Sequence, residues 1–352
     1  MWQIDNHTPF AAERTWTRGR DGAEIWLVAI KCTFDIAPNG TTSVAAVQPP
    51  VTMVPEYTNP AEQATSSLKY DIDLVRTKTT TDVVVIGHAY APNGRPATRL
   101  DVGFRVGPVI KRLHVSGDRV WRGGSITAPQ SFVRMPLVYE RAYGGSDPRT
   151  RAGDAPQWDV RNPVGCGFVA SSGRVDDVPL PNIEYPDQLI TRLKDRPAPA
   201  GFGPICAHWQ PRAAWAGTYD ERWQRERLPL LPDDFDDRYY QCAPVDQQAA
   251  QFLKGGEPVA LINLTPAGEL RFELPRVFLG LETFFTSGER QLHDKARLHT
   301  VILEPDVPRV SLLWHSALPC HPKVYKLQKT RIIEKAVLGR SSRRDEAVAE
   351  SV

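Results

Sequence analysis

The stretch V-A-L-I-N-L-T-P-A-G-E-L-R-F-E-L, from Val259 to Leu274, decides the fold class of this 352-residue chain. Its second half places Leu270, Phe272 and Leu274 at alternate positions, which is the period of a strand with one face on a core. A Thr-Pro-Ala-Gly turn at 265–268 separates that half from an equally β-rich first half. The stretch therefore predicts a β-hairpin.

Further strand patterns flank this hairpin. On its C-terminal side, Leu298–Leu303 and Arg309–Trp314 form a second predicted pair, joined by a Pro-containing turn. On its N-terminal side, runs of β-branched and aromatic residues are separated by Gly, Pro and Asn. They cover Ile25–Ile36, Tyr70–Val75, Asp82–Tyr90, Leu100–Val106 and Val109–Val115. Strands at this spacing predict a mainly β fold, with antiparallel sheets arranged as a sandwich or barrel.

The composition divides the chain into four predicted regions. Residues 1–142 are expected to be all β, and residues 258–340 carry the C-terminal hairpins. Between them, residues 143–257 are rich in Pro, Gly and Trp. We expect a long ordered insertion there with a few short helices, one of them over Asp187–Lys194. Residues 341–352 are charged and nearly free of large apolar groups, which predicts a disordered tail.

The overall charge argues against nucleic acid and membranes as partners. Lys and Arg total 43 against 41 Asp and Glu, a net charge of +2, so no global field favours polyanions. The apolar runs fall far short of the roughly 20 residues that span a bilayer.

The five cysteines form no C-x-x-C pair, and the N-terminus lacks the apolar core of a signal peptide. These features favour a reducing compartment.

Residues 201–275 concentrate Trp, Arg, Asp and Pro to an unusual degree. Within them, T-Y-D-E at 218–221 fits a capping box, which predicts a short helix starting at Tyr219. Two pairs at i,i+4 spacing, Glu221 with Arg225 and Arg222 with Glu226, would support that helix. Pro229 would end it at the preceding residue.

This segment holds the candidate partner-binding residues. Trp, Tyr and Arg dominate interface hot spots because they bury much area and keep a polar tip. The acidic run at 233–237 lacks the spacing of a calcium loop, so pairing with nearby arginines or with a partner is favoured. For each Trp the alternative is a core position. The candidates are Trp209, Arg212, Trp215, Tyr219, Arg222, Trp223, Asp233, Asp234 and Asp236.

Motifs for catalysis or cofactors are weak. The Cys206–His208 and Cys320–His321 pairs lack the paired spacing of zinc sites. The Gly-Gly dipeptides belong to no phosphate-binding loop, and the chain has no G-x-S-x-G elbow. We therefore expect no metal, no cofactor and no catalytic residue. The alternative is a hydrolase or carbohydrate-active enzyme that uses carboxylates in a Trp-lined cleft.

Several motifs, in order along the chain, resemble one bacterial family. They are N-H-T-P-F from Asn6, V-W-R-G from Val120, G-T-Y-D-E-x-W from Gly217, R-L-P-L-L-P-D-D-F-D from Arg227, A-P-V-D-Q from Ala243, G-G-E-P-V from Gly255 and L-T-P-A-G-x-L-x-F-x-L-P from Leu264. Together they resemble the family called Domain of Unknown Function 2169, over nearly the whole chain.

The resemblance implies a function. Members of this family are similar to adaptors of type VI secretion systems, which help load toxic effectors onto the VgrG and PAAR spike. A non-enzymatic adaptor or effector chaperone is therefore expected, with a toxin and a VgrG or PAAR protein as partners. Because loading precedes firing, the expected location is the cytoplasm. The family offers no catalytic constellation that could be carried over to residues of this chain.

Overall fold

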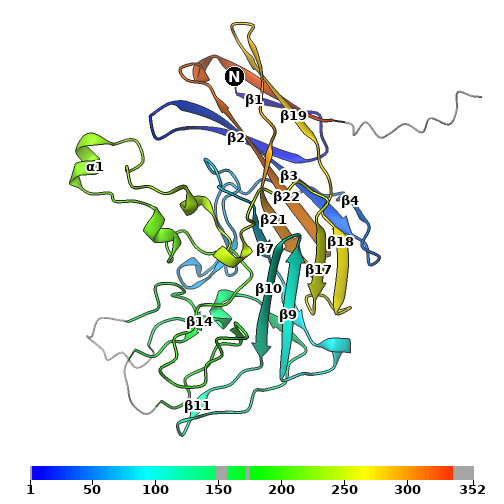
Figure 1. The fold of residues 1–352 in the computed structure, drawn as a ribbon, viewed down its shortest axis with the longest axis vertical. Coiled ribbons are helices and arrows are strands. Elements are labelled where there is room, and N and C mark those ends of the chain that lie inside the picture. Colours follow the sequence, from blue (N-terminus) through cyan, green and yellow to red (C-terminus); the bar gives the residue numbers. More distant parts are fainter. Residues whose placement is uncertain (1, 148–156, 171–174, 336–352) are drawn as a thin grey trace, which may run out of the picture.

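The computed structural model describes residues 2–147, 157–170 and 175–335. In Figure 1 the larger sheets form an elongated body, with loops and short elements gathered along one side. The predicted mainly β class, with antiparallel sheets, is confirmed. The sheets that these residues form are open, and none closes into a barrel.

The largest sheet has the order β2-β3-β22-β21-β7, with β4 also paired to β3. Neighbouring strands are antiparallel except β21 and β7, which are parallel. Every residue of β3 from Trp26 to Phe34 is buried, because both faces of this strand are covered. The strands are β2 (Ala11–Arg18), β3 (Glu24–Ile36), β4 (Thr42–Val44), β7 (Asp82–Val85), β21 (Arg297–Glu304) and β22 (Arg309–Pro319).

The five-stranded sheet contains the hairpin predicted at 259–274, in the order β16-β10-β9-β17-β18. Leu261 lies opposite Leu270, and Leu270 and Phe272 are buried while their neighbours in β18 are exposed. The predicted hairpin and its alternation are confirmed. The strands are β9 (Arg99–Val106), β10 (Val109–Ser116), β16 (Ile183–Glu184), β17 (Pro258–Ile262) and β18 (Glu269–Glu273).

A four-stranded sheet brings together both ends of the described chain, in the order β1-β23-β19-β20. β1 pairs with β23 in parallel, and β19 pairs with β23 and β20 in antiparallel fashion. One face carries Leu281 and Ile332 into the main core. The strands are β1 (Gln3–Asn6), β19 (Leu279–Phe285), β20 (Arg290–Leu292) and β23 (Leu327–Glu334).

Short strands, a helix and 3-10 turns accompany the three larger sheets. The short strands are β5 (Glu56–Tyr57), β6 (Leu68–Tyr70), β8 (His88–Tyr90), β11 (Trp121–Arg122), β12 (Ser125–Ile126), β13 (Arg134–Pro136), β14 (Tyr143–Gly144) and β15 (Cys166–Gly167). The helix of the described residues is α1 (Glu221–Glu226), accompanied by the 3-10 turns η1 (Gln63–Thr65), η2 (Pro92–Gly94), η3 (Tyr139–Arg141), η4 (Arg212–Trp215), η5 (Asp237–Tyr240), η6 (Val245–Gln247) and η7 (Val324–Lys326).

Segments far apart in the sequence pair in every large sheet. β3 pairs with β22, β9 with β17, and β1 with β23. The main core cluster accordingly combines Trp26, Val102 and Leu281, one from each sheet. The first and third predicted regions thus build one framework, while the boundaries at 142, 257 and 340 stay predictions. The predicted tail at 341–352 lies outside the described residues.

Two expected elements take other forms. The strand predicted at Tyr70–Val75 is wrong beyond Tyr70, because the carboxylates that follow turn towards buried cations: Asp71 pairs with Arg212 at 2.8 Å and Asp73 with Lys31 at 3.0 Å. The strand predicted at Asp82–Tyr90 is divided, and β7 and β8 enter different sheets.

The helix predicted at Asp187–Lys194 is also wrong. Carboxylates outside the segment take the amide hydrogens that a helix would use internally. The Asp195 carboxylate accepts from the amides of Thr191 and Arg192 at 3.0 and 2.8 Å, and Glu184 accepts from the amide of Ile190 at 2.8 Å. The segment is therefore held as turns and extended chain.

Candidate partner-binding site

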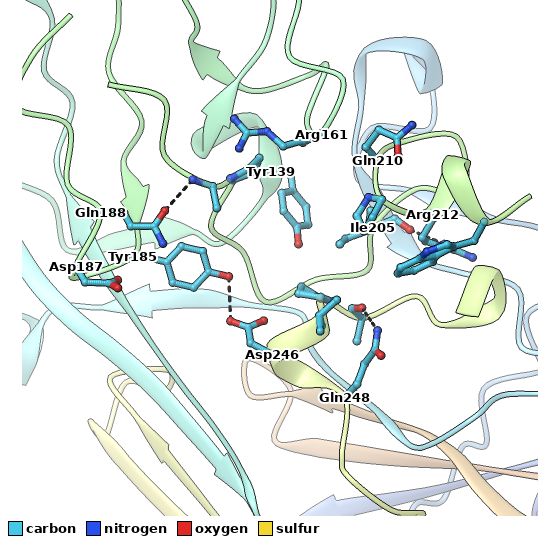
Figure 2. A pocket seen from close by; sticks show the side chains of 17 residues that line it. Tyr139, Arg161, Tyr185, Asp187, Gln188, Ile205, Gln210, Arg212, Asp246 and Gln248 are labelled. Carbon is cyan, nitrogen blue, oxygen red and sulfur yellow. Dashed lines mark hydrogen bonds between the residues drawn. The ribbon is translucent and has the colours of Figure 1, made fainter. Parts of the chain in front are cut away.

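A cavity of about 590 Å³ opens among the short elements beside the five-stranded sheet (Figure 2). Tyr139 belongs to η3, Tyr185 directly follows β16, and Asp246 belongs to η6. Arg212 and Trp215 both belong to η4. The wall is largely apolar and rich in Pro. It consists of Tyr139, Arg161, Tyr185, Asp187, Gln188, Ala198, Pro199, Ile205, Gln210, Pro211, Arg212, Trp215, Ala243, Pro244, Val245, Asp246 and Gln248.

A buried lysine supports the floor of this cavity. Lys111, on β10, donates to the Asp246 carboxylate at 2.9 Å and to the Gln247 side chain at 2.8 Å. The other Asp246 oxygen accepts from the Tyr185 hydroxyl at 2.9 Å, as Figure 2 shows. Burial lowers the pKa of Lys111 to about 8, although the Asp246 carboxylate opposes this shift. Both oxygens of Asp246 are therefore engaged within the protein.

Two of the predicted residues support the wall, Arg212 as a lining residue and Trp209 from behind Tyr139. Trp209 is buried and packs edge-on against Tyr139 with ring centroids 5.8 Å apart, so it takes the core position that the sequence left open. Arg212 is also buried, and it pairs with Asp71 at 2.8 Å and donates to the Tyr239 carbonyl at 3.0 Å. Its guanidinium therefore connects the wall of the cavity to the segment between β6 and β7.

Trp215 has an accessible position at the cavity edge. The guanidinium of Arg238 lies over its ring at 4.9 Å, a cation–π geometry. Arg238 is in turn held by Asp236, whose carboxylate also accepts from the Arg238 amide at 2.9 Å and begins η5. These hydrogen bonds from Arg238 lower the pKa of Asp236. The acidic residue thus orients an arginine over the aromatic ring.

Residues 216–236, here called the arm, project from the body and carry α1 (Figure 1). At its base the Asp234 carboxylate accepts from the Thr218 amide at 2.9 Å and from its hydroxyl at 2.7 Å. The same hydrogen bonds lower the pKa of Asp234. Arg227 pairs with Asp233 within the arm at 3.0 Å, and it connects the arm to the body by donating to the carbonyl of Arg20 in the β2–β3 turn at 2.9 Å.

The start of α1 differs from the prediction. The helix begins at Glu221, and its N-cap is Asp220, whose carboxylate accepts from the Trp223 amide at 2.8 Å. The Thr218 hydroxyl instead donates to Asp234, and Thr218 lies two residues before the N-cap. The capping box predicted from Thr218 is therefore wrong. The predicted i,i+4 pairs are present, at 3.0 Å for Arg222–Glu226 and 3.9 Å for Glu221–Arg225.

The arm exposes apolar and aromatic surface. Tyr219 is 51% exposed and Leu228 is 59% exposed. The Tyr219 ring meets the half-buried Trp223 ring edge-on at 4.7 Å, and the Trp223 indole donates to the Leu230 carbonyl at 2.8 Å. Two aromatic rings are thus held in a fixed orientation on a projecting element, with the exposed Arg222 beside them on α1.

The predicted residues fall into two groups. Trp209, Arg212 and Trp215 belong to the cavity region, whereas Tyr219, Arg222, Trp223, Asp233 and Asp234 belong to the arm, and Asp236 lies at the junction. The sequence reasoning missed Tyr139, Tyr185 and Asp246. The A-P-V-D-Q motif, which contains Asp246, was a signal for one of them.

The cysteines of the two cysteine–histidine motifs are buried, whereas His208 and His321 are exposed. Cys206 and Cys320 are both buried, and burial raises the pKa of the Cys206 thiol to about 12. Within residues 2–147, 157–170 and 175–335, no group of three or more His, Cys, Asp or Glu side chains is arranged to hold a metal ion. The helices of this described part are too short or too polar to span a lipid bilayer.

The fold and the site define a β-rich protein with a recessed aromatic cavity and a projecting aromatic arm. The model of a protein family described as "uncharacterized protein conserved in bacteria", DUF2169, matches residues 21–315. The chain belongs to this family, as its motifs indicated. No curated protein and no solved structure shows significant similarity to it.

Proposed function

We propose that this protein is a non-enzymatic adaptor that binds a toxic effector of a type VI secretion system and helps load it onto the VgrG/PAAR spike. Membership of the DUF2169 family and the resemblance of that family to such adaptors support the proposal. The observation that carries it is the arm, because a projecting element with exposed Tyr219 and Leu228 suits protein recognition.

The effector would contact the arm and the cavity together. Tyr219 and Arg222 would pack on its surface, with Trp223 fixing the Tyr219 ring. A flexible segment of the effector would enter the cavity and pack on Trp215 and Tyr139, since aromatic-lined grooves accept extended peptides. Loading before firing would place the protein in the cytoplasm, with neither nucleic acid nor membrane as a partner.

The alternative function is a carboxylate-based hydrolase or carbohydrate-active enzyme. The observation in its favour is that Asp187, Asp246 and Trp215 line one cavity. Against it, both oxygens of Asp246 already accept hydrogen bonds from Lys111 and Tyr185, which leaves this carboxylate little freedom for acid–base chemistry. The geometry favours binding over catalysis.

Site-specific photo-crosslinking in the native host tests the arm directly. A photoreactive phenylalanine analogue would replace Tyr219, and a matched control would carry it at Tyr325, a 61% exposed tyrosine on η7. We expect an adduct with one toxic effector from position 219 and none from position 325. The absence of an adduct from position 219, or the same adduct from both positions, would contradict the proposed role of the arm.

Alanine substitutions test the energetics. Arg222→Ala removes an exposed ion pair that contributes little to the free energy of unfolding. The substitution should therefore weaken effector binding with little change in melting temperature. Trp223→Ala should weaken binding further, because it also releases the Tyr219 ring. A large loss of melting temperature with unchanged affinity in the folded fraction would assign both residues a structural role.

A further inference from the structure

A second cavity, of about 650 Å³, lies where the chain after β18 crosses the start of β21. Its volume falls in the range of about 300–1,000 Å³ that is typical of ligand pockets. It shares no lining residue with the cavity of Figure 2. The wall consists of Phe252, Leu253, Lys254, Val277, Phe278, Leu279, Asp294, Lys295, Ala296, Arg297, Leu298, Trp314 and Lys335.

The lining of this cavity is largely apolar. Phe278 is 46% exposed, while Leu298 and Trp314 form part of the main core. Trp314 is 6% exposed, and its indole Nε1 is shielded from solvent. The cavity therefore offers a ligand apolar contacts with these side chains.

The rim of the cavity is strongly cationic. Lys254, Lys295, Arg297 and Lys335 are all exposed, and Asp294 is the carboxylate among the lining residues. In the part of the chain that the structure describes, none of the four cations forms an ion pair. Four cations that form no ion pair among the described residues, placed around one apolar opening, create a local positive potential, although the net charge of the whole chain is close to zero.

We propose that this cavity binds an acidic segment of a partner protein, anchored by apolar side chains. Leu, Ile or Phe side chains would fill the interior and pack against Phe278 and Trp314. Asp and Glu side chains would pair with the rim. This is a second interface, separate from the arm, and the inference does not depend on the adaptor function.

The charge of the rim favours a protein segment over a small amphiphile as the ligand of this cavity. A fatty acid also combines an apolar chain with a carboxylate, but it brings one negative charge to a rim with four cations. A segment with several Asp or Glu residues can pair with all of them. Such an interface would be screened by salt, because every rim cation is exposed.

Fluorescence anisotropy with the full-length protein tests the proposal. The probe is a labelled peptide of alternating leucine and glutamate, and the comparisons are a leucine–lysine peptide, an oligoglutamate and dodecanoate as a competitor. We expect the leucine–glutamate peptide to bind at least tenfold more tightly than either other peptide, and more weakly as salt rises. Equal binding of the leucine–lysine peptide or of oligoglutamate would overturn the proposal. Complete displacement by dodecanoate at a matched concentration would assign the cavity to a lipid instead.

Matched charge variants locate the binding. The variant K254Q/K295Q/K335Q removes three exposed rim cations and should weaken peptide binding at least tenfold. The control R95Q/R99Q/R112Q removes the same charge from exposed positions on and near β9 and β10, and it should change affinity less than twofold. Equal effects of the two variants would mean that net charge alone drives binding, which would refute a site at this cavity.

The indole resonance of Trp314 reports contact inside the cavity. Trp314→Phe assigns its Nε1–H signal among the nine Trp indoles. Peptide binding should move this signal, because apolar side chains would pack against a residue that lines the cavity. If Trp314→Phe does not fold, Phe278→Ser at a half-exposed position provides the check and should weaken binding without loss of melting temperature. An unmoved indole signal, or full affinity of Phe278→Ser, would contradict the proposed occupancy.

Discussion

A buried histidine makes the stability of this protein sensitive to acid. His315, on β22, is 4% exposed and stacks on His299 with ring centroids 4.2 Å apart. Its Nε2–H donates to the backbone carbonyl of Asp73 at 2.6 Å. This hydrogen bond connects the segment between β6 and β7 to the largest sheet. Burial lowers the pKa of His315 to about 3, the hydrogen bond to Asp73 opposes this shift, and the charge of Lys78 adds to it.

The sign and size of the effect follow from proton linkage. An unfolded histidine takes up a proton near pH 6.5, whereas the folded His315 stays neutral until about pH 3. The stabilisation is therefore complete above pH 6.5 and is lost as pH falls. Each pH unit well below 6.5 costs about 1.4 kcal/mol, and the loss per unit is about half as large near pH 6.5. His315 alone should therefore remove about 2 kcal/mol between pH 6.5 and pH 4.5. That is a large part of a typical folding free energy of about 5–15 kcal/mol.

Urea unfolding of the wild type and of His315→Gln, at pH 6.5 and pH 4.5, measures this contribution. Glutamine keeps an N–H donor but does not titrate, so the variant should lose about 2 kcal/mol less than the wild type between the two pH values. Leu313→Val, a non-titrating change on the same strand, should keep the wild-type pH dependence. The reasoning is refuted if His315→Gln loses as much stability with acid as the wild type does.

Three further substitutions test other parts of the structure. Lys78→Met leaves the buried Asp82 without its cation and should cost about 3–5 kcal/mol in urea unfolding; a loss below about 1 kcal/mol would contradict this buried pair. Asp220→Ala removes the N-cap of α1 and should lower the stability of that helix by about 1 kcal/mol. Hydrogen exchange of the helix amides should become faster accordingly, and unchanged exchange rates would contradict the prediction. Gly40→Ala should lower the melting temperature, because Gly40 has φ +84° and an added Cβ would lie 2.1 Å from a backbone carbonyl oxygen of β18; an unchanged melting temperature would show that the turn can adjust.

Local sequence patterns predicted the strands well where a single face decides burial. The alternation in β9 and β18 is an example, and both strands occur within a residue or two of the expected bounds. The pairing of β3 with β22 could not be predicted, because the two strands are nearly 300 residues apart and their pairing depends on the packing of the whole core. The helix expected at Asp187–Lys194 failed because the carboxylates of Glu184 and Asp195, which flank the segment, accept hydrogen bonds from its amides.

The candidate site was predictable only in part. Hot-spot composition selected Trp215 and Tyr219, which are accessible in the cavity and on the arm. The same composition also selected Trp209 and Arg212, because residue type alone does not distinguish a buried support from a contact surface. Tyr139 comes from a segment whose sequence carries no binding signal, and only the fold brings it to the cavity.

The most direct test of the adaptor function is affinity purification of the tagged protein from its native host, followed by mass spectrometry of the proteins recovered with it. The account predicts that one toxic effector and a VgrG or PAAR protein are enriched together, and that the effector is lost when Tyr219 and Arg222 are changed to alanine. Recovery of the tagged protein without any effector, VgrG or PAAR protein, while all three are expressed, would contradict it.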